Sequence, residues 1–375
     1  MLRTLPPPPP ATGMRPSFLP EAYQELSDAA AAARIPAVRE QLGRSLLILG
    51  HHYQRDDVIQ FADHSGDSYG LAMKAAANRE AGTIVFCGVH FMAESADILS
   101  RDEQVVILPD HEAGCSLADM ADLDQVLTAW EEIDEVCGAS AVMPITYINS
   151  GADLKALVGE QGGTVCTSSN AAAAFDWSLR QRDKAFFFPD QHLGRNTALA
   201  RGIPADDMAL WDPNERLGGN TPAALRRARV ILWKGHCSVH TRFTAEHVRR
   251  FRAEVPGIRI LVHPECTREV VELADLVGST SFIVRQVEEA PPGTQWAIGT
   301  EIHLVNRLKQ QHPEQFVTAL VPGVCLCATM NRIDPQHLLW SLERLAAGEI
   351  VNQVAVPEPT KSRARLALDR MLSIR

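Results

Sequence analysis

The chain has 375 residues, of which 46% are apolar and 22% are charged, and its formal net charge is −10. This composition is ordinary for a globular protein of two or three domains, and it excludes a basic nucleic-acid-binding face. It also excludes a membrane span, because no apolar run approaches about 20 residues.

Residues 1–20 are rich in proline and lack the apolar core of a secretory signal, so we expect a disordered tail there, with Met14 as an alternative start. The eight cysteines are few for this length and widely spread. Without an export signal, they indicate a reducing, cytoplasmic location. Metal binding or catalysis is then favoured over a disulfide framework.

Short apolar strands alternate with helices along the first third of the chain. A helix is expected over residues 21–43, and strands are expected over 45–49, 83–86 and 105–108. We expect Gly50 to stop the first of these strands. The segment 113–116 is expected to begin a helix.

The same alternation continues to the end of the chain. Further strands are expected over 141–145, 164–166, 185–188, 230–233, 258–262, 296–298 and 316–321, with a short one after Thr280. Further helices are expected over 153–158, 244–255, 268–276, 303–309, 338–346 and 361–375. The last of these is basic, and we expect it to pack on the domains with its charged side chains solvated.

This alternation predicts an α/β protein with parallel sheets. In each third of the chain, the final strand leads to a cysteine: Cys115, Cys237, and either Cys325 or Cys327. The pattern favours three similar domains that face one centre. We place them at residues 21–128, 129–243 and 244–335, with C-terminal helices of residues 336–375 packing on them.

Three thiolates from different domains can converge on one metal centre. Thiolates select zinc, copper(I) or iron–sulfur clusters. Structural zinc sites draw their ligands in close pairs, whereas these cysteines are about 90 to 120 residues apart, which argues against zinc. Cys325 and Cys327 can both face the centre, or can pair with each other as a redox switch. The alternative is that the cysteines are buried and structural.

Polar side chains follow many of the expected strands. Each of them alone is explained as a helix cap, but their joint recurrence at strand ends indicates a ligand site, because parallel sheets bind ligands there. His263 and Glu265 flank a proline and offer a base and a carboxylate for proton transfer. The candidates are His51, Tyr53, Ser68, Tyr147, Asn149, Ser168, His240, His263, Glu265, Ser279 and Thr280.

These segments resemble the quinolinate synthase family of bacterial de novo NAD biosynthesis, over roughly residues 45 to 335. The resembling motifs are Gly50-His51-His52-Tyr53-Gln54, Gly66-Asp67-Ser68, Ala113-Gly114-Cys115, Thr146-Tyr147-Ile148-Asn149-Ser150, Thr167-Ser168-Ser169-Asn170, Phe188-Pro189-Asp190, Gly235-His236-Cys237-Ser238-Val239-His240, His263-Pro264-Glu265-Cys266, Gly278-Ser279-Thr280 and Cys325–Asn331.

The resemblance implies three Rossmann-like αβα domains around a pseudo-threefold axis, with the active site at their centre. It implies a transferase that condenses iminoaspartate with dihydroxyacetone phosphate to quinolinate, releasing phosphate and two waters. It also implies a [4Fe–4S] cluster with one iron open as a Lewis acid. No nucleic-acid or membrane partner is expected. A functional link is expected to L-aspartate oxidase or aspartate dehydrogenase.

The resemblance also implies individual roles. Glu265, Tyr53, His263 and His240 are the expected catalytic residues. Substrate binding is expected from His51, Ser68, Tyr147, Asn149, Ser168, His263, Glu265 and Thr280. The expected metal ligands are Cys115, Cys237 and Cys327, with Cys325 as the alternative third ligand.

Two other functions remain open at this stage. The first is another hydro-lyase or dehydratase that uses a [4Fe–4S] cluster, which would turn over a hydroxyacid instead of iminoaspartate. The second is a redox-sensing iron–sulfur binding protein, which would need a basic or hydrophobic partner surface. The sequence shows no such surface.

Overall fold

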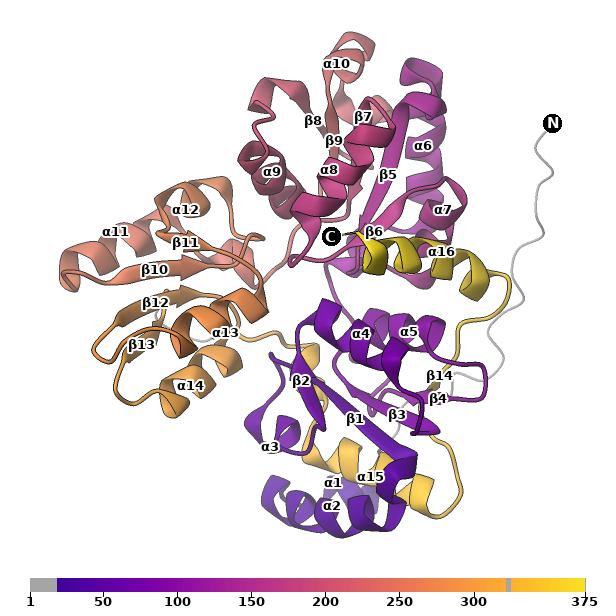
Figure 1. Cartoon of the computed structure of the whole chain (residues 1–375), viewed down its shortest axis with the longest axis vertical. Helices are drawn as coiled ribbons and strands as arrows, with labels where there is room; N and C mark the ends of the chain where they lie inside the picture. The colour runs from indigo at the N-terminus through magenta and orange to yellow at the C-terminus, as the bar shows by residue number, and fades with distance from the viewer. Residues whose placement is uncertain (1–18, 322–324, 375) are drawn as a thin grey trace.

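The computed structural model describes residues 19–321 and 325–374, so residues 1–18, with the proline-rich segment and Met14, lie outside it. Three β-sheets, each with its own helices, surround a common centre (Figure 1). All strand pairs within these sheets are parallel except one. The predicted α/β class with three αβα units is confirmed. No helix of the described ranges is long and apolar enough to cross a membrane.

The first sheet has the strand order β14-β4-β3-β1-β2. Its strands are β1 (Leu46–His51), β2 (His64–Gly66), β3 (Thr83–Cys87), β4 (Val105–Ile107) and β14 (Gln353–Val354). The helices of this part of the chain are α1 (Glu21–Gln24), α2 (Asp28–Leu42), α3 (Asp56–Ile59), α4 (Ser68–Ala77) and α5 (His90–Leu99).

The second sheet has the order β6-β5-β7-β9-β8. Its strands are β5 (Val142–Tyr147), β6 (Thr164–Cys166), β7 (Lys184–Phe188), β8 (Met208–Trp211) and β9 (Val230–Trp233). Its helices are α6 (Leu123–Cys137), α7 (Ala152–Glu160), α8 (Ala171–Gln181), α9 (Gln191–Ala200) and α10 (Pro222–Arg227). Strands β5, β6 and β9 are buried throughout, as expected for a parallel sheet that helices cover on both faces.

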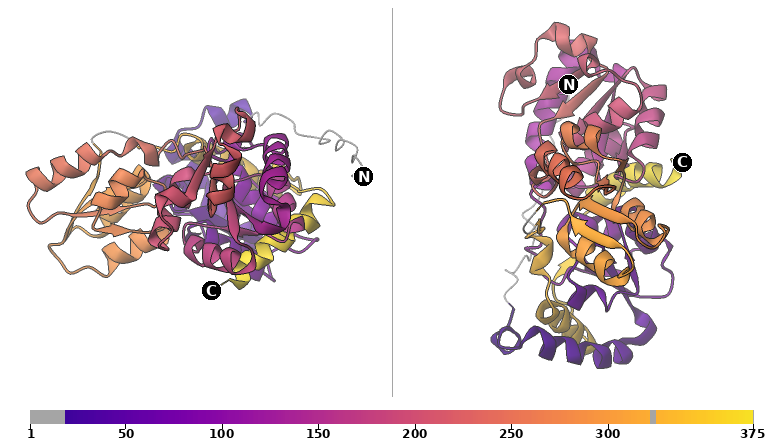
Figure 2. Two further views of the ribbon diagram at one scale, coloured as in Figure 1. Left: turned by 90° about the horizontal axis from the view of Figure 1, so that it is seen from above. Right: turned by 90° about the vertical axis from the view of Figure 1, so that its left-hand side faces the viewer.

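The third sheet has the order β11-β10-β12-β13 and forms a separate lobe in Figures 1 and 2. Its strands are β10 (Arg259–Val262), β11 (Leu276–Val277), β12 (Gln295–Gly299) and β13 (Phe316–Ala319). Its helices are α11 (Ala245–Glu254), α12 (Arg268–Leu273), α13 (Thr280–Glu288) and α14 (Ile302–Gln311). The first two sheets share one large apolar core, whereas this lobe has its own core on each face.

The end of the chain returns to the first two sheets. Helix α15 (Pro335–Ala346) packs on α2, and β14 pairs antiparallel with β4. Helix α16 (Thr360–Ser373) packs on α7. It buries Ala364, Ala367, Leu368 and Met371, so one face of this basic helix packs into the core.

Several predicted boundaries were wrong, for local reasons. The helix expected over 21–43 is two helices, because Ser27 caps the second one by accepting a hydrogen bond from the N–H of Ala30. Gly50 lies inside β1, where a Cβ would come within 2.9 Å of the Ala62 Cβ. Residues 113–115 are irregular and a turn begins at Ser116, so no α-helix starts in this segment.

The short strand expected after Thr280 is the helix α13. The Ser279 hydroxyl caps this helix, and the buried residues Thr280, Ile283 and Val287 follow a helical spacing. The predicted domain boundaries stay a prediction. The three sheets fall within them, apart from β14, which joins the first sheet from residues 353–354.

Candidate active site

A cavity of about 70 Å³ is lined by turns that follow strands of all three sheets. Apart from the alternative ligand Cys325, every residue given a role in catalysis, substrate binding or metal binding from the sequence lines it: His51, Tyr53, Ser68, Cys115, Tyr147, Asn149, Ser168, Cys237, His240, His263, Glu265, Thr280 and Cys327. Their roles stay predictions. The cavity is also lined by Asp67, Val89, Phe91, Met92, Thr167, Val239 and Met330.

Three cysteines of this cavity share one local geometry. The carbonyls of Cys115, Cys237 and Cys327 each accept a hydrogen bond from the N–H four residues later, at 3.1, 3.1 and 3.0 Å. A short 3-10 helix begins three residues after each cysteine, at Ala118, His240 and Met330. The same turn is therefore built once beside each sheet.

These turns aim N–H groups at the sulfurs. Burial raises the pKa of each thiol, that of Cys115 to about 12, but the N–H groups two and three residues later act in the opposite direction. Paired N–H groups stabilise a thiolate once it forms. No such pair acts on the buried thiols of Cys87 and Cys166; burial raises the pKa of both, that of Cys87 to about 12. The three cysteines are therefore suited, by the chemistry of their thiols and by the geometry of their turns, to bind a shared metal centre as thiolates.

Cys325 differs from Cys327 in its surroundings. It is 1% exposed and packs in a core cluster of the third lobe, and it does not line the cavity. Its carbonyl accepts a hydrogen bond from the N–H of Ile302 at 3.2 Å. The arrangement favours Cys327 as the third ligand, although the ligand assignment remains a prediction. Both thiols are free.

A metal-capable group lies beside these turns. Ligand atoms of Cys237, His240 and Glu265 all lie within 4.8 Å of one another, which would suit a single metal ion. The three cysteine thiols do not form such a compact group. A cluster of several irons takes its thiolates at different corners, so wider spacing is compatible with it.

The Glu265 carboxylate is the centre of the buried polar network. Tyr147 donates a hydrogen bond to its Oε1 at 2.5 Å, and His240 Nδ1 lies 2.7 Å from its Oε2. Burial favours the neutral acid, but His240, His263 and the Tyr147 hydroxyl outweigh it and lower the pKa of Glu265. The carboxylate is therefore charged, and it can accept a proton.

The aromatic rings around this carboxylate are held in fixed positions. His263 stacks on His240 with ring centroids 4.4 Å apart, and burial lowers the pKa of His263 to about 3. Burial also lowers the pKa of His51 to about 3, so His51 is neutral. Its Nδ1 accepts a hydrogen bond from the N–H of Tyr53 at 3.1 Å. Burial raises the pKa of Tyr53 well above 10. Both histidines are uncharged at neutral pH, and Tyr53 is protonated.

Three hydroxyls mark helix starts at the cavity. Ser68 is the first residue of α4, Thr280 is the first residue of α13, and Ser168 precedes α8 by three residues. Asp67 caps α4 by accepting the N–H of Gly70 at 2.9 Å, and it also accepts the Ser169 hydroxyl at 2.6 Å. Helix N-termini with hydroxyls favour anions.

Polar side chains on the helices of one αβα unit hold turns that belong to a neighbouring unit. Arg307 of α14 donates to the carbonyls of His52 and Gln54, at 2.9 and 2.5 Å, on either side of Tyr53. Asn196 of α9 donates to the carbonyls of Pro264 and Cys266, at 2.9 and 2.8 Å, around Glu265. The proposed catalytic groups thus sit on turns that a neighbouring unit fixes.

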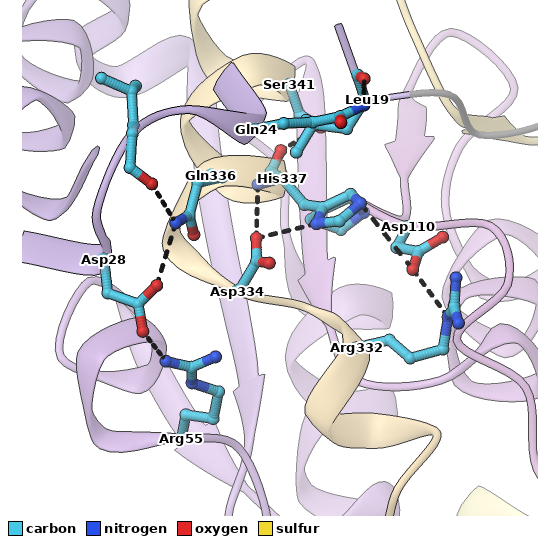
Figure 3. A network of polar contacts seen from close by, with 12 residues as sticks. Leu19, Gln24, Asp28, Arg55, Asp110, Arg332, Asp334, Gln336, His337 and Ser341 are labelled. Atoms are coloured by element: carbon cyan, nitrogen blue, oxygen red, sulfur yellow. Dashed lines mark hydrogen bonds and ion pairs between the residues drawn. The ribbon is translucent and has the colours of Figure 1, made fainter. Parts of the chain in front are cut away.

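The segment after Cys327 is held in a similar way. Arg332 Nε donates to Asp110 at 2.8 Å and so ties this segment to the one that leads to Cys115 (Figure 3). Asp334 caps α15 by accepting the N–H of His337 at 2.8 Å. Figure 3 also shows the His337 ring turned toward Asp110.

Two buried groups of the site were missed by the sequence reasoning. Thr300 bonds to both Tyr53 and His240, at 2.7 and 3.3 Å. Asp190 caps α9 and accepts the N–H of Cys237 at 3.2 Å, and burial and then Glu265 raise its pKa. Both residues follow a strand directly or within two residues, so the strand-end signal was present.

Comparisons with known proteins agree with one another. A family model described as "Quinolinate synthetase A protein" matches residues 33–373. A protein named quinolinate synthase from Herpetosiphon aurantiacus is 56% identical over 357 residues, covering 94% of this chain and 95% of the relative. Proteins of the same name from Acidobacterium capsulatum and Corynebacterium glutamicum are 57% identical (94% of this chain, 95% of the relative) and 53% identical (97% and 93%).

Proposed function

Since the chain belongs to the quinolinate synthase family of enzymes, which act in NAD biosynthesis, we propose that it condenses iminoaspartate with dihydroxyacetone phosphate. Phosphate and two waters leave, and the pyridine ring of quinolinate closes. The observation that carries the proposal is the convergence of the three cysteine turns and the charged Glu265 on one cavity.

The metal part of the proposal rests on the cysteine turns. Cys115, Cys237 and Cys327 would hold a [4Fe–4S] cluster, in keeping with the N–H groups that face each sulfur. Such a cluster, with one iron free of protein ligands, supplies a Lewis acid that polarises a substrate oxygen.

The substrate part rests on the polar groups that line the cavity together with the cysteines. Both substrates are anionic, and hydroxyls at helix N-termini can hold a carboxylate or phosphate. We assign this task to Ser68, Ser168 and Thr280, with Asn149, His51 and Tyr147 contacting the remainder of the substrates. Asn149 Nδ2 also lies 3.8 Å from the Cys115 sulfur.

The proton-transfer part rests on Glu265 and Tyr53. Ring closure requires protons to leave carbon and hydroxyl groups to leave as water, so a base and an acid are needed. The charged Glu265 can take a proton, and the protonated Tyr53 can give one. His240 and His263 orient these groups and the substrate carboxylates.

We also propose the cellular setting. The enzyme would act in the cytoplasm, with the three domains and C-terminal helices divided as the sequence indicated. The imine substrate would come from L-aspartate oxidase or aspartate dehydrogenase, because oxidation of the aspartate amine yields it.

The test is purification without oxygen, followed by an iron count, a visible spectrum and an assay with both substrates. We expect about four irons per chain, absorption by the cluster, and quinolinate as product. Turnover of a hydroxyacid in place of iminoaspartate would indicate another iron–sulfur hydro-lyase. A cluster without turnover of either substrate would favour a redox sensor.

A further inference from the structure

Lys155 is a buried lysine that the proposed chemistry does not use. It is fully buried in α7, although lysine is among the residues that are least often shielded from water. It is also the fourth residue of this helix, near the positive end of the helix dipole, where a cation is unfavourable. Both features cost stability, so we expect the ammonium to serve a purpose that an apolar side chain could not serve.

The polar contact of the Lys155 ammonium is with main chain. Burial lowers the pKa of Lys155 to about 8, so the group is still protonated at pH 7. The carboxylates of Glu94 and Asp153 favour the charged form, but neither of these two residues forms an ion pair with it. Its Nζ donates a hydrogen bond to the Ser150 carbonyl and lies 5.6 Å from the centroid of the Phe91 ring.

The carbonyl that Lys155 holds belongs to the turn Tyr147–Ser150, at the end of β5. The lysine reaches this turn because side chains on a helix point toward the helix N-terminus. The Ser150 hydroxyl donates to the Tyr147 carbonyl at 2.9 Å, and the Thr146 hydroxyl donates to the Ser150 hydroxyl at 2.9 Å. Ser150 and Thr146 are fully buried. The ammonium therefore anchors the far end of a turn whose polar groups bond to one another.

This turn presents two side chains to the cavity, and each contacts a different neighbouring unit. Tyr147 donates to Glu265 Oε1 at 2.5 Å, in the third unit. The Asn149 amide lies 3.8 Å from the Cys115 sulfur, in the first unit. Lys155 does not line the cavity. A shift of the turn would alter both contacts at once, so the residue that fixes the turn also sets the geometry of the site.

We propose that Lys155 is a positioning residue, whose ammonium fixes the turn Tyr147–Ser150 and so holds Tyr147 and Asn149 in the cavity. The inference rests on the proposed function, because both side chains are assigned to the substrates there. The alternative is that Lys155 only stabilises the fold. Against this alternative, an apolar side chain of similar length would fill the same space, and such replacements of buried charges are often neutral or stabilising.

The test removes the ammonium and keeps the length of the side chain, in Lys155→Met. Lys184→Met is the matched control, because Lys184 also donates to main chain, to the carbonyls of Arg226 and Ala228 at 2.6 Å, but lies away from the cavity. Quinolinate formation, iron content and thermal unfolding are measured for both variants. Amide hydrogen exchange of the turn is measured as well.

We expect Lys155→Met to lower kcat/KM by about 10²-fold, the effect of a small displacement of groups that contact substrate. Iron content and unfolding temperature should stay close to wild type. The N–H groups of Ile148 and Ser150, which donate to the carbonyls of Cys166 and Ile148 at 2.8 and 2.9 Å, should exchange faster. Lys184→Met should match wild type in activity and in exchange of the turn.

A double-mutant cycle separates positioning from a general loss of stability. If Lys155 acts through the turn, Lys155→Met should lower kcat/KM less than about 10-fold in an Asn149→Ala background, where one positioned group is already gone. In a Ser68→Ala background it should still cost about 10²-fold, because Ser68 lies on α4 of the first unit. A residue that only stabilised the fold would have the same effect in both backgrounds.

Wild-type kcat/KM in Lys155→Met would overturn the inference, and so would equal losses in the two backgrounds or unchanged exchange of the turn. Loss of iron would also overturn it, since Lys155 would then act on the metal centre. If Lys155→Met fails to fold, Lys155→Gln, which keeps a shorter and uncharged donor, undergoes the same comparisons. A chain that folds with neither residue would show a purely structural role.

Failure of the proposed function would look different. In that case wild type would form no quinolinate from the two substrates, whatever residue stands at position 155. Exchange of the turn in Lys155→Met and Lys184→Met does not depend on turnover, so it would still decide whether Lys155 fixes the turn.

Discussion

His240 Nδ1 and Glu265 Oε2 lie 2.7 Å apart, in a pair that is almost completely buried. The pair joins the short turn after Cys237 to the turn after β10, so it connects the second sheet to the third. With Tyr147 on the other carboxylate oxygen, the three side chains hold the negative charge of Glu265 beside the cavity.

Glu265→Gln should abolish most turnover with the fold and iron content kept. The amide cannot take a proton, so we expect kcat to fall by roughly 10²–10⁴. Quinolinate formation at full iron loading measures this. Glu272→Gln is the control, because Glu272 is exposed on α12 and pairs with Arg268 of the same helix. Activity of Glu265→Gln within a few-fold of wild type would rule out a catalytic carboxylate.

Cys115→Ser, Cys237→Ser and Cys327→Ser should each lose most of the iron, since serine is a poor substitute for a thiolate ligand. Cys87→Ser and Cys137→Ser, which lie away from the cavity, should retain it. Iron analysis and the visible spectrum after anaerobic purification measure the loss. Loss of iron in Cys325→Ser with full iron in Cys327→Ser would show that Cys325 is the third ligand.

Arg307→Met should lower activity without loss of iron. Its guanidinium holds the turn on both sides of Tyr53, and Nε also donates to Asp56 at 2.7 Å. Without these bonds the Tyr53 hydroxyl is less firmly positioned, and we expect kcat to fall about 10-fold or more. Arg307→Lys should recover little, because the compact ammonium lacks the planar guanidinium whose three nitrogens reach three separate acceptors. Equal activity of all three proteins would contradict this role.

Ser168→Ala and Thr280→Ala should weaken substrate binding, by removing hydroxyls from the proposed anion site. The apparent KM for dihydroxyacetone phosphate should rise by about 10-fold, the equivalent of one lost hydrogen bond, with iron content unchanged. Ser362→Ala serves as the control, since its hydroxyl is exposed and bonds to the Pro359 carbonyl. If kcat and KM are unchanged in both site variants, these hydroxyls do not contribute to substrate binding.

The buried His51 should make the protein less stable in acid. Its pKa is about 3 in the folded protein and about 6.5 when unfolded, so the unfolded chain binds the extra proton. The stability from a neutral His51 is complete above pH 6.5 and is lost as pH falls toward 3, by up to about 1.4 kcal/mol per pH unit.

His51→Asn should therefore show a shallower fall of the unfolding free energy between pH 6.5 and 5 than wild type. Urea unfolding at several pH values measures it. His64→Asn, at an exposed position, should keep the wild-type slope. Equal slopes in all three proteins would mean that folding does not lower the pKa of His51.

The sequence by itself determined the α/β class and the residues around the cavity. Apolar strands that alternate with helices are typical of parallel α/β sheets and of few other folds. Parallel strands bring their carboxyl ends to one edge of a sheet, so residues that follow strands, such as Ser68 and Tyr147, could be predicted to lie at a ligand site. The motifs were also sufficient to indicate the family.

Local ambiguity limited the rest of the prediction from sequence. The apolar run after Thr280 was too short to distinguish a strand from a helix, and packing of Ile283 and Val287 decided it. Gly50 looked like a strand end, but it stays in the strand, where it pairs with Ser65 and Cys87. The close approach of Ala62 leaves no room for a side chain at this position.

Only the tertiary structure decided how the site is connected. Cys327 lines the cavity and Cys325 does not, a difference that two nearly adjacent cysteines cannot show in sequence. Thr300 and Arg307 act across sheets, on residues more than two hundred positions away. Such contacts depend on how three separately formed units pack together, and no local pattern of apolar or polar residues encodes that geometry.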